Sequence, residues 1–263
     1  MTELLIRKST YDLAILVAGQ VVATNLTEEV ERHFLAQKQE IPLALQRGFV
    51  LSGTITPSAV PVEMAGYPIE ETDCFLWLGH MERFAERCFG IKIALREMFP
   101  LPSRLPWKQV LPIFNPGLTN REMVDKVFIS RELTPYESVD VMRYSGSGAS
   151  APCLYFTKRS AKPTLATMGL PPKFAKHWFA GRQTAPLNLC GYGIGTSLCY
   201  EVEKQFLDPG TWTWFPENTL SVGDVAYGNC LPHDSKVRFG CSYSDFGDDD
   251  FGFREAICLK PKT

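Results

Sequence analysis

The residues best suited to chemistry lie in the segment 171–182, where lysines, a histidine and an arginine alternate with aromatic residues. Basic side chains neutralise phosphates, and aromatic rings stack on unpaired bases. If the residues after the two prolines form a helix, Lys173, Lys176 and His177 share one face, and the aromatic residues share another. This pattern predicts that the cations point outward above buried aromatic rings, which would suit the binding of phosphates.

The segment lies in a long window that has no acidic residue. Neither aspartate nor glutamate occurs from Val141 to Tyr200, while the same window carries seven lysines and arginines. Because the net charge of the whole chain is only −2, the remaining residues must sum to −9. Segregated charge of this kind favours a polyanionic partner. The candidate nucleic-acid contacts are Arg143, Lys158, Arg159, Lys162, Lys173, Lys176, His177, Arg182 and Tyr192.

A glycine-rich run, Gly191-Tyr-Gly-Ile-Gly195, contains the last of these candidates. Glycines allow backbone N–H groups to approach phosphate oxygens, and Tyr192 could stack on a base. The run lacks the Gly-x-Gly-x-x-Gly spacing of dinucleotide-binding loops. A turn between two strands explains the same glycines, so both interpretations stay open.

Three arrangements indicate catalysis or metal binding as alternatives. His177 could act as a general base on an RNA 2′-hydroxyl, with the neighbouring lysines stabilising the developing charge. Cys230 and His233 have a spacing that zinc could use, or they could form a nucleophile and its base. Asp248 and Asp250 belong to an aspartate cluster that could hold Mg²⁺ or Ca²⁺, although an exposed turn has the same composition.

The overall composition is that of an ordinary globular protein. The chain has 263 residues, of which 45% are hydrophobic and 21% are charged, so disordered and collagen-like classes are excluded. No apolar run approaches the roughly 18–20 residues of a membrane span, and the first residues lack a secretory signal pattern. The eight cysteines are dispersed without any Cys-x-x-Cys. We therefore expect reduced thiols, a cytoplasmic location, no membrane association and no cofactor.

Hydrophobic patterns predict the elements that must position these residues. Residues 11–23 and 48–56 are typical of strands, and Asn25 is typical of a helix N-cap. An apolar stripe predicts an amphipathic helix over about 72–98, whose buried face belongs to the core. Five prolines between 100 and 116 exclude a long helix or a central strand and indicate a joint between two halves.

The chain after this joint has a different pattern. Thr119 and Glu122 form a capping box that predicts a short helix. Alternation then predicts strands at 153–157 and 211–215, and a final pair of strands around the turn that contains the aspartates. We expect an α+β fold, with a mixed helical N-terminal half packed on a β-rich C-terminal half. The expected regions are a scaffold over 1–116 and a β-rich domain with a basic aromatic face over 117–263.

The hypothesis that accounts for most of these features is a non-catalytic nucleic-acid-binding subunit of a larger ribonucleoprotein or DNA-processing assembly. Its partners would be RNA, which we favour, or single-stranded DNA, together with other protein subunits. One alternative is a structural component of a particle or secretion machine. A second is a nuclease or hydrolase that uses His177 or an aspartate-bound metal.

Overall fold

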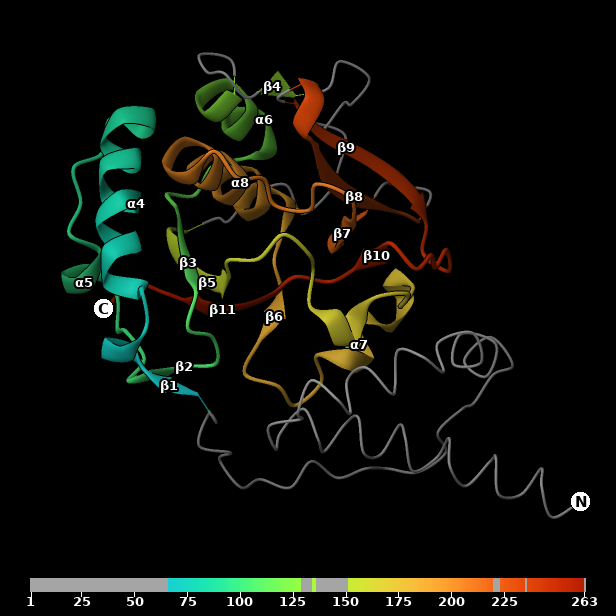
Figure 1. Ribbon diagram of the computed structural model, residues 1–263, viewed down its shortest axis with the longest axis horizontal. Coiled ribbons are helices and arrows are strands. Elements are labelled where there is room, and N and C mark those ends of the chain that lie inside the picture. Colours follow the sequence, from blue (N-terminus) through green and yellow to red (C-terminus); the bar gives the residue numbers. More distant parts are fainter. Residues whose placement is uncertain (1–65, 129–133, 136–150, 220–222, 235, 263) are drawn as a thin grey trace, which may run out of the picture. The chain divides into compact units, whose positions relative to one another are not determined.

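The computed structural model describes residues 66–128, 134–135, 151–219, 223–234 and 236–262 (Figure 1). Contacts divide the chain into the units Met1–Gly66 and Tyr67–Thr263, and nearly all the described residues belong to the second. The strands expected at 11–23 and 48–56, and the N-cap expected at Asn25, lie outside the described residues.

The second unit contains both helices and sheets, which confirms the α+β class. Its helices are α4 (Cys74–Phe89), α5 (Leu95–Met98), α6 (Asn120–Met123), α7 (Ala175–Trp178) and α8 (Leu189–Glu203). The short helical turns are η1 (Ile69–Glu71), η2 (Val124–Phe128), η4 (Leu165–Thr167), η5 (Pro172–Phe174) and η6 (Pro232–Asp234). None of the helices in the described residues is long and apolar enough to cross a bilayer.

The strands form two larger sheets and one small one. The strands are β1 (Tyr67–Pro68), β2 (Arg104–Leu105), β3 (Val110–Asn115), β4 (Thr134–Pro135), β5 (Cys153–Lys158), β6 (Ala185–Pro186), β7 (Trp212–Thr219), β8 (Asp224–Leu231), β9 (Lys236–Tyr243), β10 (Phe251–Gly252) and β11 (Glu255–Leu259). The five-stranded sheet has the order β10-β7-β8-β9-β4, and the four-stranded sheet has the order β3-β5-β11-β6. Strands β1 and β2 pair with each other.

Helix α8 lies between the two larger sheets and is buried along nearly its whole length (Figure 1). Its glycines let the backbone approach the four-stranded sheet, because a Cβ at Gly195 would lie 2.6 Å from Ile113 of β3. Toward the other sheet, the Tyr192 ring packs 5.2 Å from that of Phe215. The glycine-rich run therefore forms the start of a buried helix, and the interpretation as a turn between two strands is wrong. A helix that is apolar on every side is stable only when it is enclosed.

The long helix expected over 72–98 is interrupted. Helix α4 ends where Gly90 adopts a left-handed conformation, with φ of 69°, and α5 begins only at Leu95. The prediction that the apolar stripe forms core is confirmed, because Trp77, Met81 and Phe84 are at most 2% exposed. Glycine adopts this conformation without steric penalty, which explains why the helix stops there.

The proline-rich segment 100–116 contains β3, a strand at the edge of the four-stranded sheet. Pro112 is accommodated there because an edge strand has a free side. Strand β3 pairs with β5, so the segment lies within the unit Tyr67–Thr263. Most of the expected scaffold 1–116 lies outside the described residues, and the division at residue 116 stays a prediction.

The capping box is confirmed by its hydrogen bonds. Glu122 N donates to Thr119 Oγ1 at 3.2 Å, and Thr119 N donates to Glu122 Oε2 at 2.9 Å. The strands expected at 153–157 and 211–215 correspond to β5 and β7. The two strands expected on either side of the aspartates do not pair with each other. The first corresponds to β9. The second is divided into β10, which joins the far edge of the five-stranded sheet, and β11, which joins the other sheet.

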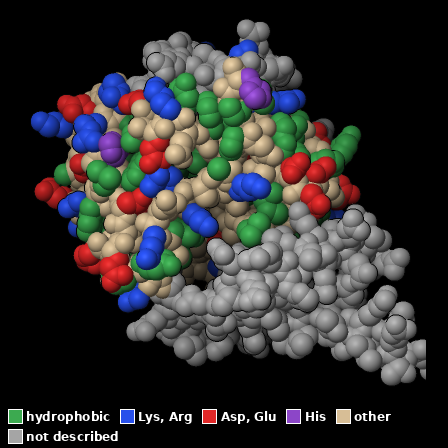
Figure 2. All heavy atoms as spheres, in the orientation of Figure 1, with side chains coloured by type: hydrophobic (Ala, Val, Ile, Leu, Met, Phe, Trp, Pro, Cys, Tyr) green, Lys and Arg blue, Asp and Glu red, His purple; other side chains and the backbone are tan. Residues whose placement is uncertain are grey.

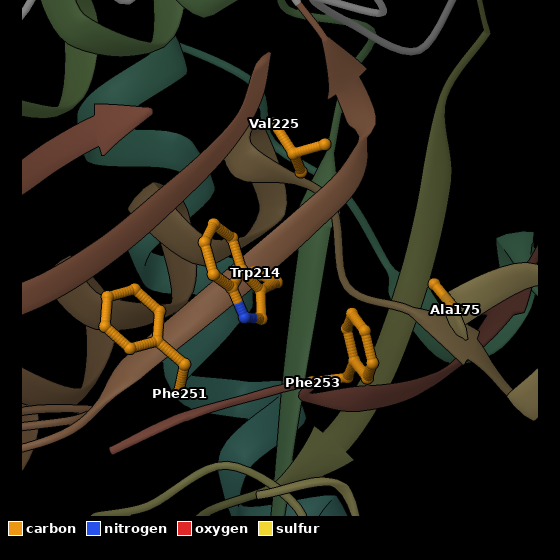
Figure 3. Close-up of a cluster of buried hydrophobic side chains, with 5 residues drawn as sticks. All are labelled: Ala175, Trp214, Val225, Phe251 and Phe253. Carbon is orange, nitrogen blue, oxygen red and sulfur yellow. The ribbon is translucent and has the colours of Figure 1, made fainter. Parts of the chain in front are cut away.

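A cluster of buried side chains, most of them aromatic, packs against α7 (Figure 3). Its buried members are Ala175, Trp214, Val225, Phe251 and Phe253. The rings of Trp214 and Phe251 lie 4.6 Å apart, and both are at most 8% exposed. Burial of large aromatic side chains is a dominant source of stability in a core. Through Ala175 this cluster fixes the position of α7.

Candidate nucleic-acid interface

The turn η5 carries Lys173, and helix α7 carries Lys176 and His177. Lys173, Lys176 and His177 are exposed, whereas Trp178 is half-buried. On the inner side, Ala175 is 4% exposed. The paired prolines position η5, because Pro172 occupies its first helical position, where no backbone N–H is required. The prediction of outward cations is confirmed, whereas the aromatic residues Phe174 and Trp178 are only half-buried.

The loop that follows β9 lies against residues 171–173, just before α7. Lys173 N donates to Ser244 O at 2.9 Å, and a Cβ at Gly247 would lie 2.9 Å from Pro171 Cγ. Two aromatic side chains of this loop are exposed, Tyr243 by 72% and Phe246 by 40%. Rings of this kind can stack on unpaired bases. We call Lys173, Lys176, His177, Tyr243 and Phe246 the α7 surface.

Only a weak pattern in the sequence points to Tyr243 and Phe246 as binding residues. They flank Asp245, at the start of a segment for which the sequence indicates either a metal site or an exposed turn. Sequence alone does not show that this turn folds back against residues 171–173. The contact between Lys173 and Ser244 joins residues that are far apart in the chain, and it depends on the tertiary fold.

Two of the predicted phosphate contacts are instead paired with carboxylates. Arg159 Nη1 donates to Glu203 at 2.6 and 2.7 Å, its Nη2 bonds to Asp73, and its guanidinium lies 4.5 Å from the centre of the Trp77 ring. Through these contacts the arginine joins the start of α4 to the end of α8, and its side chain is only 14% exposed. An arginine held in this way has few donors left for a phosphate, so we leave Arg159 out of the interface.

Arg182 is held in a similar way. Its Nη1 lies 3.6 Å from Glu255 Oε1, and its Nε donates to Trp178 O at 2.7 Å. The guanidinium also stacks over the Trp178 ring at 4.2 Å. Trp178 Nε1 in turn donates to Glu255 at 3.1 Å, and burial raises the pKa of this carboxyl group. Arg182 therefore fastens α7 to β11, and we leave it out of the interface as well.

Tyr192 cannot stack on a base, and this prediction is wrong. Its side chain is 0% exposed, and its hydroxyl lies 3.4 Å from Leu207 O. The tyrosine follows the first of the helical glycines, so the geometry that buries the glycines also encloses its ring between α8 and the five-stranded sheet.

Arg143 lies outside the described residues. Lys158 and Lys162 are exposed.

The two members of the candidate zinc pair lie in different environments. Cys230 is fully buried, with its Sγ 3.7 Å from Tyr192 Oη and 3.9 Å from Thr196 Oγ1, whereas His233 is exposed. Burial raises the pKa of the Cys230 thiol to about 12, which disfavours the thiolate that zinc binding or nucleophilic attack requires. The prediction that Cys230 and His233 act together is wrong.

The aspartates form an exposed turn. Asp250 N donates to Asp248 Oδ1 at 3.2 Å, a bond that is typical of an Asx turn. Within the described residues, no three histidine, cysteine, aspartate or glutamate side chains lie close enough together to hold a metal ion. Figure 2 shows acidic side chains gathered at the right of the view, where Figure 1 places the connection between β9 and β10. This negative charge lies beside the α7 surface.

A small cavity lies beside Arg159. Its volume is about 20 Å³, and it is lined by Arg159, Ser160, Ala161, Cys199, Gln205, Phe206 and Leu207. A space of this size holds about one water molecule. This cavity is therefore too small for a nucleotide or another large ligand.

Comparison with protein-family models, with curated proteins and with solved structures found no match to this chain.

Proposed function

We propose that this protein binds nucleic acid, with RNA favoured, through the α7 surface, and that it acts as a non-catalytic subunit of a larger assembly. The observation that carries the proposal is the contact between Lys173 and Ser244, which brings two exposed aromatic rings to a row of exposed cations. Cations that follow a phosphate backbone next to rings that stack on bases are typical of single-strand binding.

Further cations extend the same region. Glu255 N donates to Thr164 Oγ1 at 3.3 Å, and Glu255 Oε1 accepts from Trp178 of α7. The loop that carries Lys162 and the helix that carries Lys176 therefore meet at one residue of β11. A strand bound across this region would have Lys162 as an additional phosphate contact, beyond the α7 surface.

The α7 surface is held rigidly, which supports a role in recognition. Ala175 is fixed in the aromatic core, and the ring of Phe179 packs edge-on against Phe253 at 5.9 Å. Arg182 provides a third attachment through its ion pair with Glu255. A preorganised surface loses less conformational entropy when it binds than a flexible one does.

The test compares binding of short labelled RNA and DNA by the wild-type protein and by the double variant Lys173→Glu/Lys176→Glu, over a series of salt concentrations. We expect at least a tenfold loss of affinity, and a salt slope that is shallower by about 1.4 for a single strand. The matched control is Lys92→Glu/Lys126→Glu, which reverses two exposed lysines outside the α7 surface. Equal loss in both double variants would contradict the proposed location.

Stacking is tested separately with Tyr243→Ala. We expect weaker binding by about 1–3 kcal/mol with an unchanged salt slope, because a ring carries no charge. Absence of RNA and DNA binding by the wild-type protein at low salt would overturn the proposal. In that case, self-assembly measured by light scattering would favour the structural alternative.

A further inference from the structure

A pair of cysteine thiols and a tyrosine meet on the four-stranded sheet, separate from the α7 surface. Cys153 and Tyr155 are two residues apart on β5, and Cys258 of β11 is directly opposite Tyr155. All three side chains therefore lie on the same face of the sheet. The two cysteines are diagonal neighbours across this strand pair, and each thiol affects the ionisation of the other. Cys258 is exposed, whereas Cys153 is only 5% exposed.

The N-terminus of α8 orients the tyrosine. Asn188 caps the helix, because its Oδ1 accepts from Gly191 N at 2.7 Å. With the amide oriented in this way, Asn188 Nδ2 donates to Tyr155 Oη at 2.9 Å. The Tyr155 hydroxyl uses its oxygen as the acceptor, so its own proton is available to a neighbouring sulfur.

These contacts distinguish the two thiols chemically. The hydrogen bond from Cys153 lowers the pKa of Cys258 to about 7, and Lys260 and Tyr155 act in the same direction, while partial burial and Glu217 oppose them. The shared hydrogen bond and burial raise the pKa of Cys153. Cys258 is therefore the accessible thiolate, and Cys153 keeps its proton beside it.

We propose that Cys258 and Cys153 form a peroxide-responsive dithiol, in which Cys258 is oxidised first and Cys153 then closes a disulfide. Such a disulfide would link β5 to β11. All eight cysteines of the chain are free in the structure. This inference does not depend on nucleic-acid binding.

The chemistry requires hydrogen peroxide as the oxidant and proceeds in two steps. The Cys258 thiolate attacks one peroxide oxygen, which forms an S–O bond and breaks the O–O bond, and the released hydroxide takes up a proton to become water. The Cys153 sulfur then attacks the Cys258 sulfur, and the S–O bond breaks. The hydroxyl group leaves with the Cys153 proton as a second water molecule. One peroxide is reduced to two waters while two thiols are oxidised to one disulfide.

The first test treats the wild-type protein with hydrogen peroxide and maps the products by mass spectrometry. We expect a peptide pair that is cross-linked through Cys153 and Cys258. In Cys153→Ser, the oxidised Cys258 should persist as a sulfenic acid that dimedone traps. The control is Cys241→Ser, which removes a half-buried thiol of β9 and should leave the cross-link intact. Faster oxidation of Cys241 than of Cys258, or absence of the cross-link, would overturn the proposal.

A second test needs no variant of a buried cysteine. The rate at which iodoacetamide alkylates Cys258 in the wild-type protein should rise with pH through a midpoint near the pKa of about 7. An ordinary cysteine has its midpoint at about 8.5. Tyr155→Phe, which removes the hydroxyl proton, should raise the Cys258 midpoint while leaving that of Cys241 unchanged. An ordinary midpoint for Cys258 in the wild-type protein would contradict the proposed activation.

Discussion

Asp208 and Arg254 face each other across 2.5 Å, from Oδ1 to Nη2, with side chains that are 0% and 2% exposed. The other polar atoms of the pair have further partners, except Arg254 Nε, which is buried without one. Asp208 Oδ2 accepts from Thr213 Oγ1 at 2.6 Å, and Arg254 donates to the carbonyl oxygens of Lys158 and Ser160, both at 3.1 Å. The pair therefore joins the loop before β7 to β11 and to the end of β5, and so connects the two larger sheets.

Removing one member of this pair should be strongly destabilising. Asp208→Asn leaves the guanidinium of Arg254 buried without a counter-charge, and we expect a loss of about 3–5 kcal/mol in the free energy of unfolding. The measurement is equilibrium denaturation with urea. The double variant Asp208→Leu/Arg254→Met should recover part of the loss, because apolar side chains need no counter-charge.

The control for this prediction is Glu203→Gln, which removes one partner of a more exposed arginine. Arg159 also bonds to Asp73, and the Glu203 side chain is 27% exposed. A partly solvated pair contributes about 1 kcal/mol or less. If Asp208→Asn were no more destabilising than Glu203→Gln, the buried pair would not hold the sheets together.

The glycines of α8 should not tolerate a methyl group. In Gly195→Ala, the new Cβ would lie 2.6 Å from Ile113 Cδ1 and 3.2 Å from Leu111 Cδ2. Overpacking of this kind costs about 1–3 kcal/mol of stability. Gly79→Ala in α4 is the control, since its nearest neighbour would be Arg83 Nη1 at 3.7 Å. That variant should stabilise the protein by about 0.5–1 kcal/mol, because alanine favours a helix. Urea denaturation of both variants distinguishes packing from helix propensity.

The acidic turn should weaken the binding of a polyanion. Asp245 is exposed between Tyr243 and Phe246 of the α7 surface. Asp245→Asn removes this repulsion, and we expect RNA affinity to rise about two- to fivefold at low salt, as for other exposed charges. The difference should vanish in high salt. Glu97→Gln, an exposed change in α5, serves as the control, and a similar gain there would indicate an effect of net charge alone.

The capping box of α6 should contribute to stability in a pH-dependent way. Hydrogen bonds from the Thr119 backbone and side chain lower the pKa of Glu122, so its contribution is present above the unfolded-state pKa and is lost as pH falls through the folded-state pKa. Thr119→Ala removes the cap and should cost about 1 kcal/mol at neutral pH. This difference from the wild-type protein should shrink in thermal denaturation at acidic pH. A pH-independent difference would contradict the role of Glu122.

Features that depend on residues close together in the sequence could be predicted. The capping box at Thr119, the outward cations of α7 and the buried stripe of α4 follow from short-range spacing, and the structure contains all three. The placement of Tyr192 could not be predicted in this way, because glycines that signal a turn also permit close packing of a helix. The same limit applies to Arg159, whose carboxylate partners come from positions 73 and 203.

The enclosed position of α8 has a consequence for folding. Each helical glycine disfavours an isolated helix by about 1 kcal/mol relative to alanine, so this segment has little tendency to form alone. Its partners include Ile113 of one sheet and Phe215 of the other, which are separated by about a hundred residues of chain. Contacts over such distances form slowly, and α8 becomes stable only when both sheets have assembled around it. The unit Tyr67–Thr263 should therefore unfold in a single cooperative transition, with the amide hydrogens of α8 among the last to exchange with solvent.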